Sequence, residues 1–147
     1  MADAKSYLGV ARAPFLALPV TLVVSGAAAG ALDGAFHWPR TLLALAGLVA
    51  AHVAVNAFNE ASDFRTGIDL KTERTPFSGG SGVLPAGALS PRAAWRLAFL
   101  SVLVAGADGV WLVLETGWAL VPVIAVGAVC ILLYTDVLAR IGLGEVA

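Results

Sequence analysis

The chain has 147 residues, of which 59% are hydrophobic and 13% are charged, and its mean hydropathy is +0.87. Since soluble domains carry about 25% charged residues, this composition excludes an ordinary soluble protein and indicates a protein that resides in lipid. The net charge of -1 offers no basic surface to nucleic acid, and the single Cys130 excludes an intrachain disulfide.

Four apolar stretches follow in chain order, at residues 13–32, 41–58, 93–114 and 118–134. Each is close to the roughly 20 residues that a helix needs to cross the hydrocarbon core of a bilayer. No alternation of period two is present, and backbone groups in lipid must be satisfied within each segment, so all four are predicted to be helices. The expected fold class is an all-α integral membrane protein with about four transmembrane helices.

The first stretch is also compatible with a secretory signal peptide, because Lys5 and Arg12 precede it and the small residues 25–29 resemble a cleavage site. Its length and the three similar stretches after it favour a spanning helix. Pro14 and Pro19 do not oppose this interpretation, since membrane helices tolerate proline.

Basic residues are distributed unevenly between the two sides of the expected spans. Eight of the nine lie before the first stretch, between the second and third or at the start of the third, or after the fourth: Lys5, Arg12, Arg65, Lys71, Arg74, Arg92, Arg96 and Arg140. Only Arg40 lies on the other side. The positive-inside rule therefore predicts a multi-pass protein of a bacterial-type inner or plasma membrane, with both termini and the segment between the second and third stretches in the cytoplasm. Trp38, Trp111 and Trp118 would then lie at the outer interface.

Residues 60–91 break the apolar pattern with several glycines and prolines and are predicted to form a cytoplasmic active-site loop. Within it, residues 79–82 read Gly-Gly-Ser-Gly and could approach a phosphate group with backbone N–H groups. An ordinary flexible loop explains this short run equally well.

Polar side chains gather where the second stretch ends. Four of them lie at positions i, i+3, i+4 and i+7, which places them on one helical face: Asn56, Asn59, Glu60 and Asp63. Acidic groups that converge need a cation, and oxygen ligands of this kind suit a Mg²⁺ ion that is shared with substrate phosphates. The alternative is a polar helix end that is simply solvated at the interface.

Asp69 follows Gly67, where the helix is expected to end, and would add a further carboxylate. The interleaved cations Arg65, Lys71 and Arg74 supply positive charge for phosphate oxygens, which arginine can bind bidentately. A phosphorylated substrate is therefore predicted at this end of the helix.

Two further polar residues lie inside the apolar stretches. His52 precedes the polar face by one turn, and a lone histidine on a buried helix is more often a hydrogen-bonded packing residue than a catalytic one. Asp108 lies in the third stretch, where a carboxylate is costly, although two helical turns would bring it to the outer interface. The residues alone assign Asp108 no role.

The run from Asn56 to Asp69, followed by the run from Arg74 to Pro85, resembles the first aspartate-rich region of the UbiA prenyltransferase superfamily. The spacing is most similar to the menaquinone-type branch, the 1,4-dihydroxy-2-naphthoate polyprenyltransferases. The segments at residues 12–14, 134–135 and 142–145 also resemble family landmarks, so the resemblance extends along the whole chain. Glu60 departs from it, since aspartate is common there, and Asp136 stands in a segment that usually bears proline.

The resemblance implies a reaction and a set of site residues. A polyprenyl diphosphate would ionise at the membrane surface, and an aromatic acceptor would capture the allylic cation. Mg²⁺ would be held by Asn59, Asp63 and Asp69 while the diphosphate departs. The residues expected to bind the diphosphate are Asn56, Arg65, Lys71, Arg74 and Ser78.

Family members have about nine spans and a second aspartate-rich loop, so this chain resembles an N-terminal half. It is therefore expected not to transfer prenyl groups alone, and to need the missing half or a second copy. A function of a different class is a non-catalytic membrane protein, a transporter-like fragment or an assembly subunit, whose acidic face binds a cation without chemistry.

Overall fold

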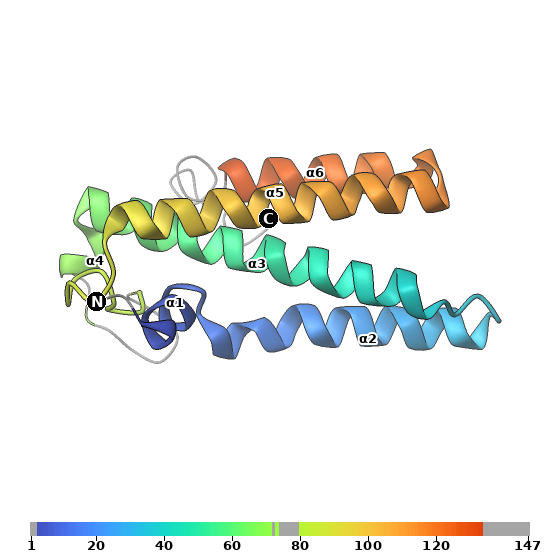
Figure 1. The fold of residues 1–147 in the computed structure, drawn as a ribbon, viewed down its shortest axis with the longest axis horizontal. Helices are drawn as coiled ribbons and strands as arrows, with labels where there is room; N and C mark the ends of the chain where they lie inside the picture. The colour runs from blue at the N-terminus through green and yellow to red at the C-terminus, as the bar shows by residue number, and fades with distance from the viewer. Residues whose placement is uncertain (1–2, 72, 74–79, 134–147) are drawn as a thin grey trace.

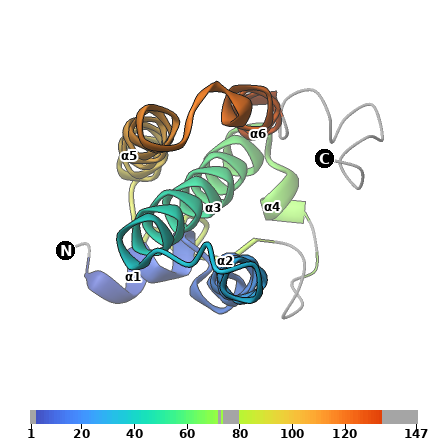
Figure 2. The same ribbon diagram turned by 90° about the vertical axis from the view of Figure 1, so that its right-hand side faces the viewer.

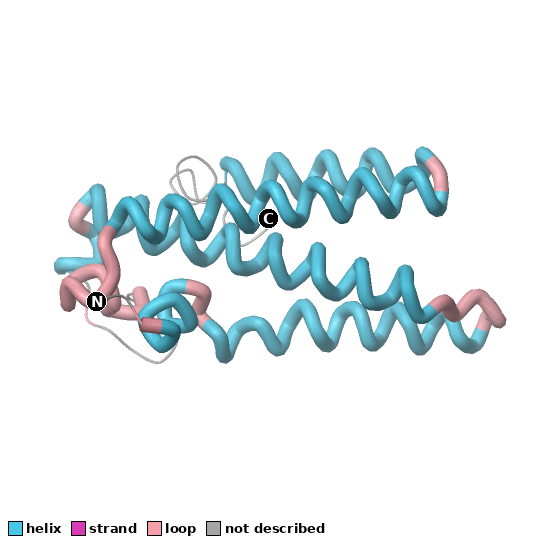
Figure 3. The backbone as a smooth tube through the Cα atoms, viewed as in Figure 1, coloured by secondary structure: helices cyan, strands magenta, loops and turns pink. Residues whose placement is uncertain are grey.

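The computed structural model of the chain describes residues 3–71, 73 and 80–133, and all its regular elements in these ranges are helices. The main ones run alternately up and down, side by side (Figure 1): α2 (Ala17–Leu32), α3 (Trp38–Thr66), α5 (Pro91–Thr116) and α6 (Val121–Leu133). Short connections join α2 to α3 and α5 to α6 at one end of the molecule (Figure 3). The prediction of an all-α membrane protein is confirmed.

Three helical segments are long and apolar enough to cross a membrane, at Ala13–Leu32, Trp38–Thr66 and Pro91–Thr116. The first consists of the short 3-10 helix η1 (Ala13–Leu16) and α2. The fourth expected span, 118–134, is occupied by the 3-10 helix η2 (Trp118–Leu120) and α6, which form a shorter apolar segment within the described residues.

The helix α3 lies at the centre of the bundle, with α2, α5 and α6 around it when the molecule is viewed end-on (Figure 2). Its closest partner is α5. The buried residues between them are mostly alanines, which let two helices approach closely: Ala54, Ala57 and Ala61 from α3, and Ala94 and Ala98 from α5. Phe58 adds an aromatic contact to this interface, since its ring packs edge-on against Trp95 and Phe99.

Most large apolar side chains on the outer faces of the helices are exposed, among them Leu22, Leu103 and Val123. In water such a surface would be an unusually large hydrophobic patch. Apolar side chains that face lipid carry no such penalty. The exposed apolar faces therefore agree with a helix bundle that lies in a bilayer.

Different kinds of residue gather at the two ends of the bundle. One end carries α1 (Ala4–Val10), α4 (Ile68–Lys71) and the turns that lead into α5 (Figure 1). The other end carries the connections to α3 and α6, with Trp38, Trp111 and Trp118 exposed by 66%, 58% and 79%. This arrangement suits an aromatic belt at one interface; which side of the membrane it faces stays a prediction from the basic residues.

The helix α3 is longer than the apolar stretch at 41–58, and residues 60–66, which were expected to begin the loop, are helical. Polar residues end a hydrophobic pattern without ending a helix. The helix ends at Gly67, whose φ of 78° and ψ of 9° form a left-handed C-cap as expected. At 1.5 Å per residue α3 is about 43 Å long, which exceeds the thickness of the hydrocarbon core, about 30 Å. Its polar C-terminal turns are here called the projecting end of α3.

Candidate functional site

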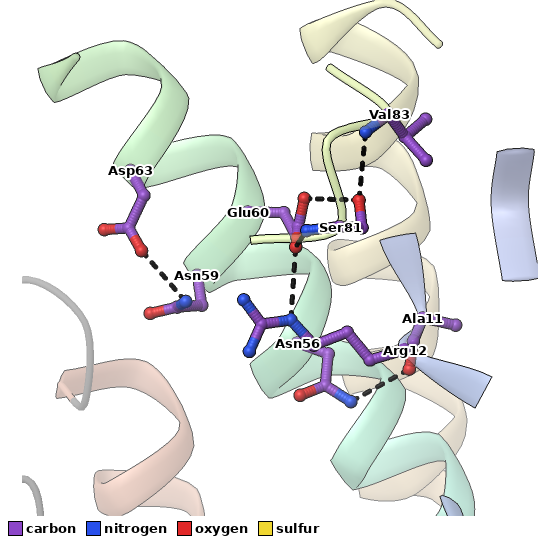
Figure 4. Close-up of polar contacts among 8 residues, drawn as sticks. All are labelled: Ala11, Arg12, Asn56, Asn59, Glu60, Asp63, Ser81 and Val83. Carbon is purple, nitrogen blue, oxygen red and sulfur yellow. Dashed lines mark hydrogen bonds and ion pairs between the residues drawn. The ribbon is translucent and has the colours of Figure 1, made fainter. Parts of the chain in front are cut away.

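The projecting end of α3 carries a pair of oxygen-bearing side chains one helical turn apart. Asn59 Nδ2 donates a hydrogen bond of 2.9 Å to Asp63 Oδ2, and both side chains are partly buried (Figure 4). The bond fixes the orientation of the Asp63 carboxylate relative to the helix. Asn59 and Asp63 are both predicted metal ligands, and this hydrogen bond links them directly.

Glu60 departs from the polar face on which the sequence placed it. Its side chain is fully buried and turns away from Asp63 toward the Gly-rich turn (Figure 4). Glu60 Oε1 accepts from Ser81 N at 2.5 Å and from Arg12 Nε at 3.1 Å, and Oε2 accepts from Ser81 Oγ at 2.7 Å. The predicted face spans about 100° of the helix, which is wide enough for its two edges to meet different neighbours. Glu60 therefore binds Arg12 and Ser81, although it shares a helical face with Asn59 and Asp63.

Arg12 reaches Glu60 because the backbone turns sharply between α1 and η1. Its φ of 51° and ψ of 55° are left-handed, and it is the non-glycine residue with positive φ in the described chain. This conformation is unfavourable for a residue with a Cβ and persists where neighbouring contacts hold it. The ion pair with Glu60 is such a contact.

Asn56 also binds this corner instead of joining Asn59. Its Nδ2 donates to the carbonyl oxygen of Ala11 at 2.9 Å. Since Ala11 directly precedes Arg12, the bond holds the end of α1 against α3. The contact gives Asn56 a structural role.

Asp69 lies on α4 and is buried, with 6% of its surface exposed. Its carboxylate packs against the Gly-rich turn so closely that a Cβ at Gly80 would lie 2.8 Å from Asp69 Cγ. Gly80 has a φ of 72°, so both its conformation and this contact require glycine. The turn therefore lies between two carboxylates. Gly80 contacts Asp69, and Ser81 is hydrogen-bonded to Glu60.

The carboxylate of Glu60 is engaged by Arg12 and Ser81. Among residues 3–71, 73 and 80–133, no group of three or more His, Cys, Asp or Glu side chains is placed to hold a metal ion. The predicted metal ligands Asn59, Asp63 and Asp69 include an amide, so they remain a proposal beside this result.

The cations predicted to bind diphosphate are only partly described. The guanidinium carbon of Arg65 lies 6.0 Å from the centre of the Trp95 ring, at the outer limit of a cation–π contact. Arg65 is also about 200° around the helix from Asp63, which directs it toward α5. Lys71 ends α4, but its side chain lies outside the described residues, as do Arg74 and Ser78.

The two polar residues inside the spans are held within the bundle. His52 Nδ1 lies 3.0 Å from the carbonyl oxygen of Leu48 in its own helix, which supports a packing role. Asp108 packs against α3, where a Cβ at Gly47 would lie 3.0 Å from Asp108 Cβ. Asp108 Oδ2 is buried and has no hydrogen-bond partner within the described part of the chain.

Comparison with known proteins adds the decisive observation. A sequence model of the UbiA prenyltransferase family matches residues 17–147. The chain belongs to the UbiA prenyltransferase family. No curated protein and no solved structure matches it. Membership identifies the chain as a membrane prenyltransferase and leaves its branch and its substrates open.

UbiA proteins typically depend on Mg²⁺, and the donors at the end of α3 suit this ion. Mg²⁺ takes oxygen ligands only and often binds through one or two carboxylates, with phosphate and water completing its shell. Asn59 and Asp63 offer an amide and a carboxylate side by side. This pair fits Mg²⁺ chemically if a phosphorylated substrate supplies the remaining ligands.

Sequence reasoning missed the role of Arg12 and Ser81 as partners of Glu60. Their distances from Glu60 along the chain, 48 and 21 residues, conceal the contacts. One signal was available: a glutamate near the end of a membrane helix needs a cation, and Arg12 stands at the same end of a neighbouring helix.

Proposed function

We propose that this UbiA protein is a Mg²⁺-dependent intramembrane transferase that moves a polyprenyl chain from a polyprenyl diphosphate to an aromatic acceptor. The observation that carries the proposal is the hydrogen-bonded pair of Asn59 and Asp63 at the projecting end of α3. The pair lies within the region that matches the family.

The position of the pair suits an amphiphilic substrate. The apolar part of α3 spans the hydrocarbon core, and Asn59 and Asp63 follow directly after it. A polyprenyl chain could remain in lipid while its diphosphate lies at the membrane surface beside them. This geometry favours a lipid-linked diphosphate over a water-soluble phosphate ester.

The proposed reaction begins with cleavage of the allylic C–O bond, in which both electrons leave with the diphosphate. A ring carbon of the acceptor then forms the new C–C bond and loses its proton. Bound Mg²⁺ would supply Lewis-acid stabilisation of the departing diphosphate. Asn59, Asp63 and Asp69 are the residues proposed to hold it, and the bond from Asn59 keeps the Asp63 carboxylate oriented.

The residues proposed to bind the diphosphate differ in their support. Lys71, Arg74 and Ser78 stay in the proposal on the strength of the sequence. The contacts of Asn56 with Ala11 and of Arg65 with Trp95 favour structural roles for these two side chains.

We further propose that the acceptor is a quinone precursor of the menaquinone type. The support is the spacing of Asn59, Asp63 and Asp69, at positions i, i+4 and i+10, which resembles that branch. A direct test supplies membranes that contain the protein with dihydroxynaphthoate or with hydroxybenzoate and identifies the prenylated product.

The experiment that tests the reaction is the Asp63→Asn variant, which keeps the shape of the side chain and removes its charge. We expect Mg²⁺-dependent release of diphosphate, assayed in membranes from cells that produce the protein, to fall by about a hundredfold or more. Asp33→Asn is the matched control, since Asp33 is exposed at the opposite end of the bundle. Normal turnover by Asp63→Asn would remove Asp63 from the site. Absence of Mg²⁺-dependent release by the unmodified protein would instead favour the non-catalytic function.

A further inference from the structure

Glu60 connects three segments that are distant in sequence. Its carboxylate, fully buried, joins α3 to the corner at Arg12 and to the turn at Ser81 through three hydrogen bonds (Figure 4). Ser81 Oγ in turn accepts from Val83 N at 3.2 Å, which closes the turn on itself. Glu60 directly follows Asn59 in α3. The hydrogen bonds of Glu60 therefore fix the positions of Arg12 and Ser81 relative to the Asn59–Asp63 pair.

The turn at Gly80 and Ser81 links Glu60 to Asp69. Ser81 is bound to Glu60, and the preceding Gly80 is in contact with the Asp69 carboxylate, with 2.9 Å between Asp69 Oδ1 and the position of a Gly80 Cβ. A displacement of Ser81 would move Gly80 away from Asp69. One buried contact of Asp69, the one with Gly80, therefore depends on the bond between Ser81 and Glu60.

The Arg12 guanidinium is held by only one of its nitrogens. Nε binds Glu60, and Figure 4 shows the two terminal amino groups turned away from that carboxylate, on the side of Asn59. In the part of the chain that the structure describes, no hydrogen bond engages these amino groups. A guanidinium fixed in this way can donate two parallel hydrogen bonds to a phosphate group.

We propose that Glu60 is a positioning residue of the diphosphate site. Glu60 holds the Arg12 guanidinium and, through Ser81, the contact between Gly80 and Asp69 in place beside the Asn59–Asp63 pair. The proposal rests on the proposed function, because it assumes that Asn59 and Asp63 bind a metal–diphosphate group. Glu60 does not touch the diphosphate; it acts through Arg12 and Ser81.

The direction in which Glu60→Gln changes the affinity for diphosphate distinguishes a positioning role from a purely electrostatic one. Glu60→Gln removes a negative charge near an anionic ligand, so charge alone would strengthen binding of diphosphate. Positioning requires the opposite result, because the amide cannot hold the Arg12 guanidinium by an ion pair. We expect the dissociation constant of Mg²⁺ with inorganic diphosphate, measured by calorimetry on the purified protein in detergent, to rise at least tenfold.

A disulfide offers a way to restore the arrangement without Glu60. The Cβ position of Gly9 on α1 lies 4.0 Å from Val83 Cβ, which is within the range for a disulfide. In a Cys130→Ser background, Gly9→Cys with Val83→Cys should lock the turn to α1. Oxidation should bring the affinity of the Glu60→Gln protein back to within about threefold of the wild type, and a reducing agent should abolish the recovery.

Phe99→Ala controls for a general loss of stability. It removes an aromatic contact from the α3–α5 interface without touching Arg12, Glu60 or Ser81. The folded fraction of this variant should bind diphosphate normally. An equal loss of affinity in Phe99→Ala and Glu60→Gln would overturn the positioning role, and so would unchanged or tighter binding by Glu60→Gln.

Failure of the proposed function would look different. If the wild-type protein does not bind Mg²⁺ with diphosphate, or if Asp63→Asn binds as well as the wild type, the site itself is wrong and the positioning role falls with it. If Asp63→Asn loses binding while Glu60→Gln keeps it, only the positioning role is overturned.

Discussion

Glu60 shows how a fully buried charge can be retained near the surface of a membrane protein. Removal of one partner from a buried ion pair typically costs about 3–5 kcal/mol, whereas exchange of the whole pair for apolar side chains is often neutral. The pair of Glu60 with Arg12 is therefore weak evidence for stability alone. Its three hydrogen bonds instead specify one arrangement of α1, α3 and the turn.

The contact of Gly80 with Asp69 leads to a prediction. In Gly80→Ala the added methyl group would collide with the Asp69 carboxylate and would also sit on a backbone with a φ of 72°. We expect a loss of diphosphate release of at least tenfold, because Asp69 must move. The assay is the one described for Asp63→Asn.

Gly87→Ala is the matched control for this variant. Gly87 has a similar φ of 68°, but a Cβ there would meet no other atom within 4 Å. Both substitutions carry backbone strain of about 1–2 kcal/mol, so only the collision with Asp69 distinguishes them. Equal losses in the two variants would contradict a role for the contact.

The N-cap of α1 gives the molecule a local pH dependence. Asp3 Oδ1 accepts from Ser6 Oγ at 2.7 Å and from Ser6 N at 2.8 Å. These bonds, the side-chain one foremost, hold the pKa of Asp3 below its ordinary value, which is about 3.9. A lowered pKa in the folded state means that the cap stabilises α1 above the unfolded pKa and is lost as the pH falls through the folded pKa.

We therefore expect the amide protection factors of α1, measured by hydrogen exchange, to be constant above about pH 5 and to decrease below about pH 4. Asp3→Ala should show weaker protection throughout, because the cap is absent. It should also lack the acid-dependent decrease. The same acid-dependent decrease in both proteins would exclude Asp3 as its origin.

Among the helices, α3 determines where the site lies. Its buried alanines pack against α5, and its polar end continues past the apolar stretch until Gly67 stops it. Because the same helix crosses the core and carries Asn59 and Asp63, the depth of the site in the membrane is fixed by the length of the helix and not by a flexible loop.

The orientation of the helices is a further prediction. If the end that carries α1 and α4 is cytoplasmic, Ala86→Cys should react with a membrane-impermeant thiol reagent only after cells are permeabilised. Ala35→Cys, in the connection before α3, should react in intact cells. Both positions are exposed, and Cys130→Ser removes the background thiol. The reverse pattern of labelling would contradict the positive-inside assignment.

The bundle as a whole presents a polar site on one side and much uncovered apolar surface on the others. Asn59 and Asp63 are only partly buried at the C-terminal end of α3. We infer that another polypeptide surface covers the open face.

For the purified chain of residues 1–147 we accordingly expect self-association in detergent and no prenyl transfer by the monomer. Light scattering coupled to size exclusion measures the oligomeric state. Each fraction is then assayed for Mg²⁺-dependent release of diphosphate, with and without an aromatic acceptor. Robust turnover by a monodisperse monomer would show that this chain is sufficient by itself.

Local patterns predicted the elements that lipid imposes. The length and polarity of the apolar stretches identify the spanning helices, since an unsatisfied backbone in hydrocarbon is prohibitive. Gly67 predicted the end of α3, because glycine adopts the left-handed conformation of a helix C-cap without strain. The spacing of Asn59 and Asp63 placed them one turn apart, and their hydrogen bond follows from it.

Only the tertiary structure could assign the partners of Glu60. On the helical wheel Glu60 belongs with Asn59 and Asp63, but the segments that reach it come from the start of the chain and from the turn before α5. Helical periodicity defines which side chains share a face and says nothing about which segment packs there. The charge of a buried carboxylate must be met by its nearest neighbours, and packing across 48 and 21 residues of chain decided what those neighbours are.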